Sequence, residues 1–151
     1  MPLCWEAITA FSTLVSALVI FITGFFLFYQ LREMKKATIA QAFSSIATML
    51  DDDRVRNARY TLMSISQNDF TKWTEKEIDN AAKACSTFDT VGIMVSNGII
   101  DHKMVTREWR YSIIECWEHA QPMIAAYRKQ RGKDFWDDFE GLYNKAKLIS
   151  V

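Results

Sequence analysis

The chain has 151 residues, enough for one soluble domain, and half of them are hydrophobic. Its 18 Lys and Arg balance its 18 Asp and Glu, so the overall charge gives no indication of binding to long nucleic acid. Only 5 Gly and 2 Pro are present, too few for the many turns of an all-β fold. The 3 Cys are far apart and form no CxxC pair, which argues against a disulfide framework and a zinc site.

Residues 7–29 contain no charged side chain. As a helix, this run of about 23 residues would span roughly 34 Å, whereas the hydrocarbon core of a bilayer is about 30 Å thick. A cleaved signal peptide would have a basic segment before the run and a small-residue site after it, and the sequence has neither. We therefore predict a transmembrane anchor over residues 1–30.

The charges on either side of the anchor predict its orientation. Only Glu6 precedes the apolar run, whereas Arg32, Lys35 and Lys36 follow it. Because positive charge stays in the cytoplasm, we expect a single-pass protein of the bacterial inner membrane with its N-terminus outside. The basic cluster itself is expected to contact lipid headgroups.

Small and hydroxyl-bearing residues recur along one face of the predicted anchor: Thr9, Ala10, Thr13, Ser16, Ala17, Thr23 and Gly24. In lipid, close packing of small residues and hydroxyl hydrogen bonds drive helices together. With one such helix per chain, the stripe predicts a homo-oligomer. Two alternatives stay open, because several copies could line a pore with hydroxyls, or the hydroxyls could bond only to their own helix.

The chain after the anchor is predicted to be all-α. No helix breaker separates residue 29 from residue 50, so the anchor is expected to continue into a juxtamembrane stalk over residues 31–50. Acidic residues 51–53 predict a stop and a restart, with a second helix over 52–64 and a loop over 66–71. Thr74 and Glu77 match a capping box that opens a third helix, which Asn97 and Gly98 would end.

Two further helices complete the predicted cytoplasmic domain over residues 51–151. Asp101 is expected to cap a fourth helix that runs through His119 and has Met104, Trp109, Ile113, Cys116 and Trp117 facing inward. Pro122 should kink this helix or open the next one. Gly132 is then expected as a C-cap and Asp134 as the N-cap of a last helix, whose apolar residues are Phe135, Trp136, Phe139, Leu142, Tyr143 and Leu148.

The sequence offers little catalytic chemistry. Glu115 and His119 lie four residues apart on one predicted helix face, but zinc normally takes three or four protein ligands. No nucleophile elbow, zinc-protease motif or phosphate-binding Gly loop is present. The Arg–His motif of helical ribonucleases of the HEPN type is also missing. We therefore expect no enzyme activity, no metal and no cofactor.

Basic clusters are the remaining candidates for a site. One lies on the second helix, one on the fourth and one at the end of the helix before Gly132. Solvated helix surface explains such clusters, and so does the preference of cations for helix C-termini. The helix-end cluster comprises Arg128, Lys129, Arg131 and Lys133. The functional alternative is anion binding, for example of a cyclic oligonucleotide, by Arg54, Arg56, Arg59, Lys103, Arg107 and Arg110.

Several pieces of the sequence together resemble a known group of proteins. They are the opening Pro2-Leu3-x-Trp5-Glu6-Ala7-Ile8, the anchor end Gln30-Leu31-Arg32-Glu33, and the tail Trp117-Glu118-x-x-x-Pro122-x-Ile124 with Arg128, Trp136, Phe139-Glu140 and Leu142. They resemble a bacterial family known only as a domain of unknown function, with one anchor and a helical cytoplasmic domain. The layout is also similar to small CRISPR-associated membrane effectors, some of which form pores or bind cyclic oligoadenylate.

These observations lead to two functional hypotheses. The first is a membrane-anchored homo-oligomeric effector, in antiviral defence of the CRISPR type, that opens or perturbs the membrane when it senses a signal such as a cyclic oligoadenylate. The alternative is a passive adaptor, in which the anchor only tethers a protein-binding helical domain.

Overall fold

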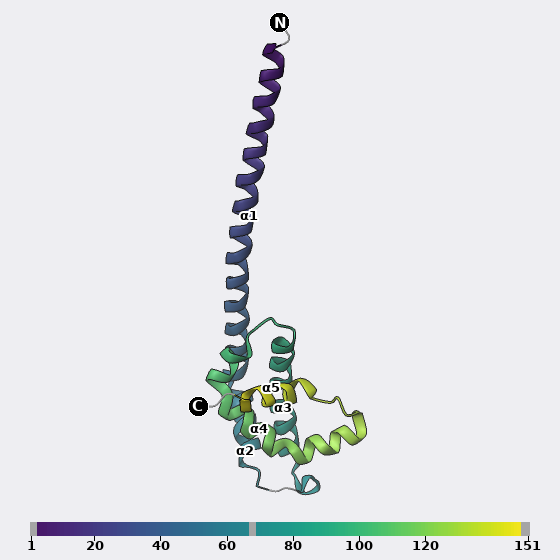
Figure 1. Cartoon of the computed structure of the whole chain (residues 1–151). Coiled ribbons are helices and arrows are strands. Elements are labelled where there is room, and N and C mark those ends of the chain that lie inside the picture. Colours follow the sequence, from purple (N-terminus) through teal and green to yellow (C-terminus); the bar gives the residue numbers. More distant parts are fainter. Residues whose placement is uncertain (1–2, 67–68, 149–151) are drawn as a thin grey trace. The chain divides into compact units, whose positions relative to one another are not determined.

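The structure is a computed structural model that describes residues 3–66 and 69–148. Its elements are α1 (Leu3–Asp51), α2 (Asp53–Ser64), the short 3-10 helix η1 (Phe70–Lys72), α3 (Glu75–Ser96), α4 (His102–Arg131) and α5 (Asp137–Leu148) (Figure 1). The described residues contain helices and no strand, which confirms the predicted all-α fold. The chain divides into two compact units, residues 1–40 and residues 41–151.

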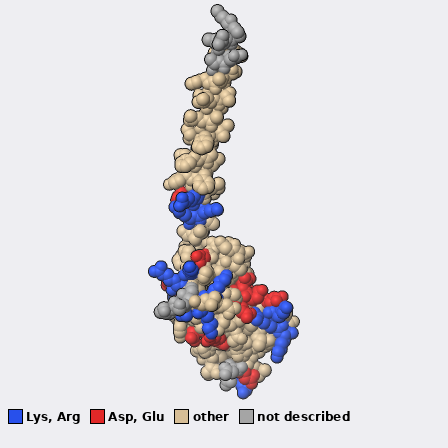
Figure 2. Space-filling view, viewed as in Figure 1, with Lys and Arg blue, Asp and Glu red and all other residues tan. Residues whose placement is uncertain are grey.

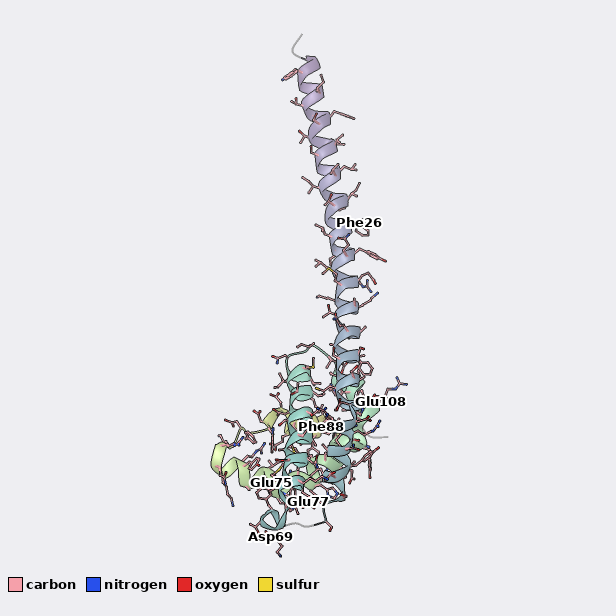
Figure 3. The ribbon with its side chains drawn as sticks, turned by 180° about the vertical axis from the view of Figure 1, so that it is seen from behind. Phe26, Asp69, Glu75, Glu77, Phe88 and Glu108 are labelled. Carbon is pink, nitrogen blue, oxygen red and sulfur yellow. The ribbon has the colours of Figure 1, made fainter. Side chains whose placement is uncertain are left out.

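The first unit is the apolar part of α1. The most apolar 18-residue window of this helix has a mean hydropathy of 2.3, and none of that window is buried. Its large side chains project outward, as Phe26 does in Figure 3. The protein therefore has one N-terminal helix that is long and apolar enough to cross a membrane.

The second unit begins inside α1, earlier than the predicted start of the helical domain at residue 51. Ala42, Ile46 and Leu50 are buried in its core, whereas they were assigned to the stalk from the sequence. Burying an Ile or Leu side chain contributes about 1.5–3 kcal/mol. The last turns of α1 are therefore a structural part of the helical domain.

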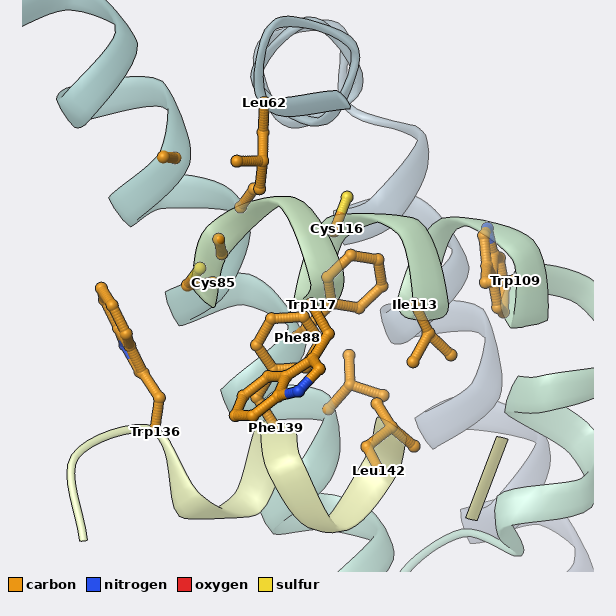
Figure 4. Packing of buried hydrophobic residues seen from close by; sticks show 14 of the residues in the cluster. Leu62, Cys85, Phe88, Trp109, Ile113, Cys116, Trp117, Trp136, Phe139 and Leu142 are labelled. Atoms are coloured by element: carbon orange, nitrogen blue, oxygen red, sulfur yellow. The ribbon is translucent and has the colours of Figure 1, made fainter. Parts of the chain in front are cut away.

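The core of this domain is rich in aromatic side chains (Figure 4). Phe88 of α3 stacks on Phe139 of α5 at a centroid distance of 5.1 Å, and Trp117 of α4 meets Phe139 edge-on at 5.0 Å. Helix α3 packs most extensively on α5 and α2, and α4 packs mainly on α5. Offset and edge-to-face pairs of this kind stabilise beyond the area they bury, so the three rings fix how α3, α4 and α5 meet.

The structure confirms the predicted boundaries between the first three helices, which depend on caps. Helix α1 ends at Asp51, and the side chain of Asp52 accepts hydrogen bonds from the first amides of α2. Thr74 and Glu77 form the capping box of α3, with the Thr74 amide donating to Glu77 at 2.7 Å. Gly98, in the turn that follows α3, has a positive φ of 68°. Such caps act through neighbouring backbone groups, which is why the sequence alone predicts them.

Of the two alternatives at Pro122, the structure excludes the start of a new helix, and it places the kink of the fourth helix elsewhere. Helix α4 does not end at His119 but continues through Pro122 to Arg131, and its one non-helical residue is Trp109. The Trp109 ring is buried and lies 5.9 Å from the ring of Phe43. Tertiary packing of Trp109 therefore accompanies the kink, while the helix on either side of Pro122 is held by buried Ala120, Met123 and Ile124.

The start of the last helix also differs from the prediction. Gly132 ends α4 with a φ of 110°, as expected, but residues 133–136 form a turn and Asp134 is not the N-cap. Helix α5 begins at Asp137, after Trp136 in a left-handed conformation with a φ of 58°. The buried Trp136 ring explains why a bulky residue adopts this conformation, since burial of a large ring offsets the local cost.

Met104, which was predicted to face inward, and Leu148, an apolar residue of the last predicted helix, are both exposed. Met104 is 38% exposed near the start of α4, and Leu148 is 83% exposed at the end of α5. Both lie in terminal turns, where the apolar periodicity continues but the neighbouring helices no longer cover the face. The described part of the 66–71 loop also contains the start of η1, which Asp69 caps by accepting from the Thr71 amide.

Candidate functional site

The predicted small-residue stripe lies on α1 and is exposed along its length. Each of its hydroxyls donates a hydrogen bond to the carbonyl four residues earlier, at 2.8–2.9 Å: Thr9 to Trp5, Thr13 to Thr9, Ser16 to Ser12 and Thr23 to Val19. This geometry matches the alternative in which the hydroxyls bond to their own helix. It leaves the face of the stripe available, because a Cβ added at Gly24 would meet no atom within 4 Å.

The predicted basic residues of α2 have three different environments. Arg59 is only 6% exposed, and its guanidinium donates to the carbonyl of Leu50 at 2.8 Å while lying 6.0 Å from the Phe88 ring. This contact places a positive charge at the C-terminal end of α1, where the helix dipole favours it. Arg56 pairs with Asp53, and Arg54 is exposed.

The basic residues of α4 also separate by role. The Arg110 side chain donates to the carbonyl of Ala146 at 2.9 Å and so caps the C-terminal end of α5. Lys103 and Arg107 are exposed, and Arg107 lines a shallow groove of about 360 Å³ with Phe43, Met104 and Glu108. Arg59 and Arg110 thus have structural partners. Of the six predicted ligand residues, Arg54, Lys103 and Arg107 are therefore the ones that are exposed and make no ion pair with a described residue.

The helix-end cluster is tied into the fold through one of its members. Arg128 donates to the carbonyl of Phe135 at 2.9 Å and pairs with Glu140 at 2.8 Å. Arg131 lies over the rings of Tyr127 and Phe135 at 5.2 and 5.1 Å. These contacts hold the turn between α4 and α5. Figure 2 shows basic and acidic side chains interspersed over this unit, without one large basic face in that view.

Glu115 and His119 lie on the same face of α4, with His119 Nε2 3.6 Å from Glu115. The other ring nitrogen, Nδ1, lies 3.0 Å from the carbonyl of Ile65, and since a carbonyl only accepts, Nδ1 donates. Ile65 is the C-cap of α2. His119 therefore joins α4 to the end of α2.

The sequence did not predict a contact between α3 and the beginning of α5. Asp89 accepts a hydrogen bond from the Phe139 amide at 3.0 Å, and its carboxylate clusters with those of Asp137 and Asp138 within 4.8 Å. Burial raises the pKa of Asp89, and the neighbouring carboxylates raise it further. Asp89 acts as an N-cap supplied by another helix. In the sequence, the one signal for this contact was the acidic Asp89 next to the apolar face of α3.

Cys85 and Cys116 have no nucleophilic character. Cys85 and Cys116 are fully buried, and they lie among the core residues in Figure 4. Burial raises the pKa of Cys116 to about 12 and raises that of Cys85 as well. Since the thiolate is the reactive form, both thiols behave as small apolar core groups.

The fold defines a class of small all-α proteins with one long apolar N-terminal helix followed by a packed helical domain. Within that class, the chain belongs to a family described as a domain of unknown function, DUF4760, whose model matches residues 11–146. The match includes both most of the apolar helix and the helical domain. Comparisons with curated proteins and with solved structures find no match.

Proposed function

We propose that this protein is a single-pass protein of the bacterial inner membrane that works as a non-enzymatic homo-oligomer, with its N-terminus outside and its helical domain in the cytoplasm. The observation that carries the proposal is the exposed apolar surface of α1, in which no residue of the most apolar window is buried. A contiguous apolar surface of this size is expected to meet lipid or other chains. The basic residues after residue 30 support the orientation.

Membrane insertion and orientation have direct tests. The protein should stay in the membrane pellet after alkaline carbonate extraction. Green fluorescent protein fused to the C-terminus should fluoresce, whereas alkaline phosphatase fused there should be inactive. Release by carbonate contradicts insertion, and an active phosphatase fusion contradicts the orientation.

The small-residue stripe is the proposed contact between copies. Because a side chain at Gly24 has open space within the chain, Gly24→Leu should not disturb the isolated helix. Between closely packed helices the same change introduces a clash. We expect the detergent-purified protein to have a defined oligomeric mass, and the triple variant Ala10→Leu, Ala17→Leu, Gly24→Leu to shift it to monomer.

A matched control replaces Leu18 by Ile and Ile22 by Leu, two residues that are exposed on the face of α1 opposite the stripe. These changes keep the apolar volume, so the mass should remain that of the native oligomer. A monomeric native protein, or a triple Leu variant with unchanged mass, contradicts the stripe as an interface.

The leading role for such an oligomer is that of a membrane effector. In this proposal the helical domain senses an anionic signal, for example a cyclic oligoadenylate, and a change in oligomer packing opens or perturbs the membrane. Arg54, Lys103 and Arg107 are the exposed cations available for the signal, and symmetry would repeat each of them. The signal must bind one arrangement of the oligomer better than the other. Planar-bilayer recordings test this role, since a silent protein with each candidate nucleotide contradicts it.

The second candidate is a tethered adaptor, in which α1 only localises a protein-binding helical domain. A specific observation favours it, because the stripe hydroxyls are hydrogen-bonded to their own helix. In addition, Arg59 and Arg110, which had been candidates for a ligand site, cap helices. An adaptor would keep its cellular partners when the stripe is replaced by Leu, whereas an effector would lose its membrane activity.

A further inference from the structure

A short part of α1, at the end of the apolar run, carries a groove of its own. Phe28, Leu31, Arg32 and Lys35 line it, and its volume is about 250 Å³. Their spacing of three, four and seven residues places them on one face of the helix. Phe28 and Leu31 are 70% and 58% exposed, so the described part of the chain leaves this apolar surface uncovered.

The charges around this groove are unequal. Lys36 lies just outside it, and its ammonium is paired with Glu33 at 2.8 Å. Arg32 and Lys35 make no ion pair with any described residue. The basic band on α1 in Figure 2, with an acidic side chain beside it, is this segment. Its net positive charge is therefore carried by the two residues of the groove.

With the apolar run inserted as proposed above, the groove lies at the level of the lipid headgroups. Arg32 is three residues beyond Tyr29, the end of the uncharged run, and Lys35 is six. At about 1.5 Å per residue these positions are roughly 4.5 and 9 Å further along the helix axis. Headgroups occupy about 5–8 Å on each side of the hydrocarbon core, and long basic side chains reach back toward it.

We infer that this groove is a binding site for an anionic phospholipid of the cytoplasmic leaflet. The Arg32 guanidinium and the Lys35 ammonium hold the phosphate and the negative headgroup, while Phe28 and Leu31 contact the first methylene groups of an acyl chain. Arg is suited to the phosphate, because its donors form a fork that matches two phosphate oxygens. The inference depends on the proposed membrane insertion and adds the class of lipid that this surface selects.

The test is native mass spectrometry of the full-length protein in detergent, titrated with phosphatidylglycerol or with phosphatidylcholine of the same acyl chains. The native protein should bind phosphatidylglycerol at least about tenfold more tightly. Arg32→Gln and Lys35→Gln should each reduce this preference by roughly fivefold. Lys36→Gln is the matched control, because it also removes one positive charge, and it should leave the preference nearly unchanged.

Three results would overturn the site. They are equal binding of the two lipids, a loss in Lys36→Gln as large as in Arg32→Gln, and displacement of phosphatidylglycerol by millimolar inorganic phosphate, which would indicate a phosphate site without lipid recognition. Carbonate extraction distinguishes a failure of membrane insertion from a failure of the lipid site. Release of the protein refutes membrane insertion and the lipid site together, whereas retention with equal lipid binding refutes the lipid site alone.

Discussion

Two residues one turn apart on α3 hold the beginning of α5. Asp89 accepts from the Phe139 amide, and Gly92 lies against the backbone of Asp138. A Cβ built on Gly92 would overlap the Asp138 carbonyl, so the two helices approach each other as closely as a glycine permits. At the residue scale, the contact between α3 and α5 therefore depends on the small size of Gly92 and on the carboxylate of Asp89.

The close approach at Gly92 predicts the effect of adding a single methyl group. Gly92→Ala should destabilise the helical domain by about 1–3 kcal/mol, because the obstacle is backbone and α5 must move. Gly141→Ala is the control, since a Cβ there meets no atom within 4 Å, and it should stabilise by about 0.5–1 kcal/mol. Urea unfolding in detergent, followed by near-ultraviolet circular dichroism, measures both. Equal effects of the two variants would contradict the proposed contact.

The raised pKa of Asp89 predicts a pH dependence of stability. In the folded chain this carboxyl keeps its proton to a higher pH than in the unfolded chain, where the usual value is 3.8. Its contribution to stability is therefore fully present below 3.8 and is lost as the pH rises through the raised folded value. Asp89→Asn keeps an acceptor for the Phe139 amide and does not titrate.

The stability of Asp89→Asn relative to the native protein should accordingly increase with pH from about 3.8 upward and then level off. Unfolding free energies measured at several pH values between about 4 and 7 test this. Parallel pH profiles for the two proteins would show that Asp89 titrates normally. Asp89→Ala, which also loses the hydrogen bond, should be less stable than Asp89→Asn throughout.

At the scale of single elements, helix ends are set by local hydrogen bonds and helix interiors by packing. The capping box of Thr74 and Glu77 was predictable, because every partner is within three residues. The same hydrogen bonds from Thr74 lower the pKa of Glu77. The kink at Trp109 was not predictable, because the Phe43 ring that contacts Trp109 comes from another helix.

The capping box gives a prediction for α3. Thr74→Ala should cost about 1 kcal/mol of stability, because the Glu77 amide loses its acceptor. Thr90→Ala is the matched control, since Thr90 is exposed within the same helix and its hydroxyl bonds only to the Ser86 carbonyl. We expect Thr90→Ala to change stability by less than about 0.5 kcal/mol. A similar loss in both variants would contradict a specific role of the cap.

At the scale of the whole molecule, the boundary of the helical domain lies inside a continuous helix. The change from exposed to buried apolar side chains occurs after residue 40, although α1 itself has no break there. Ile46 and Leu50 belong to the core, and the Leu50 carbonyl receives the Arg59 guanidinium. The last turns of α1 are thus both a continuation of the apolar helix and a part of the domain core.

This boundary predicts how truncated chains behave. A chain of residues 41–151 should unfold cooperatively, whereas a chain of residues 51–151 loses the burial of Ile46 and Leu50. The loss amounts to roughly 3–6 kcal/mol, which is a large part of the stability of a small domain. Thermal unfolding of the two chains, followed by near-ultraviolet circular dichroism, compares them. Equal midpoints would show that the end of α1 contributes nothing to the core.

The sequence by itself determined the features that depend on local chemistry. Uncharged residues 7–29 indicated the apolar helix, and polar residues at the ends of helices indicated most caps. The family was also recognisable, from a pattern that extends over nearly the whole chain. These signals are readable because hydropathy and capping involve residues that are neighbours in the sequence.

Only the tertiary structure decided which charged side chains are exposed and which bond to groups of another helix. Arg54 and Arg59 look alike in the sequence, yet Arg59 is buried at the end of α1 while Arg54 is exposed. Arg107 and Arg110 lie one turn apart on α4, yet Arg110 donates to the Ala146 carbonyl of α5 while Arg107 is exposed. The physical reason is that a cation's partner is set by where the fold places carbonyls and carboxylates, and residue type and spacing alone do not contain that information.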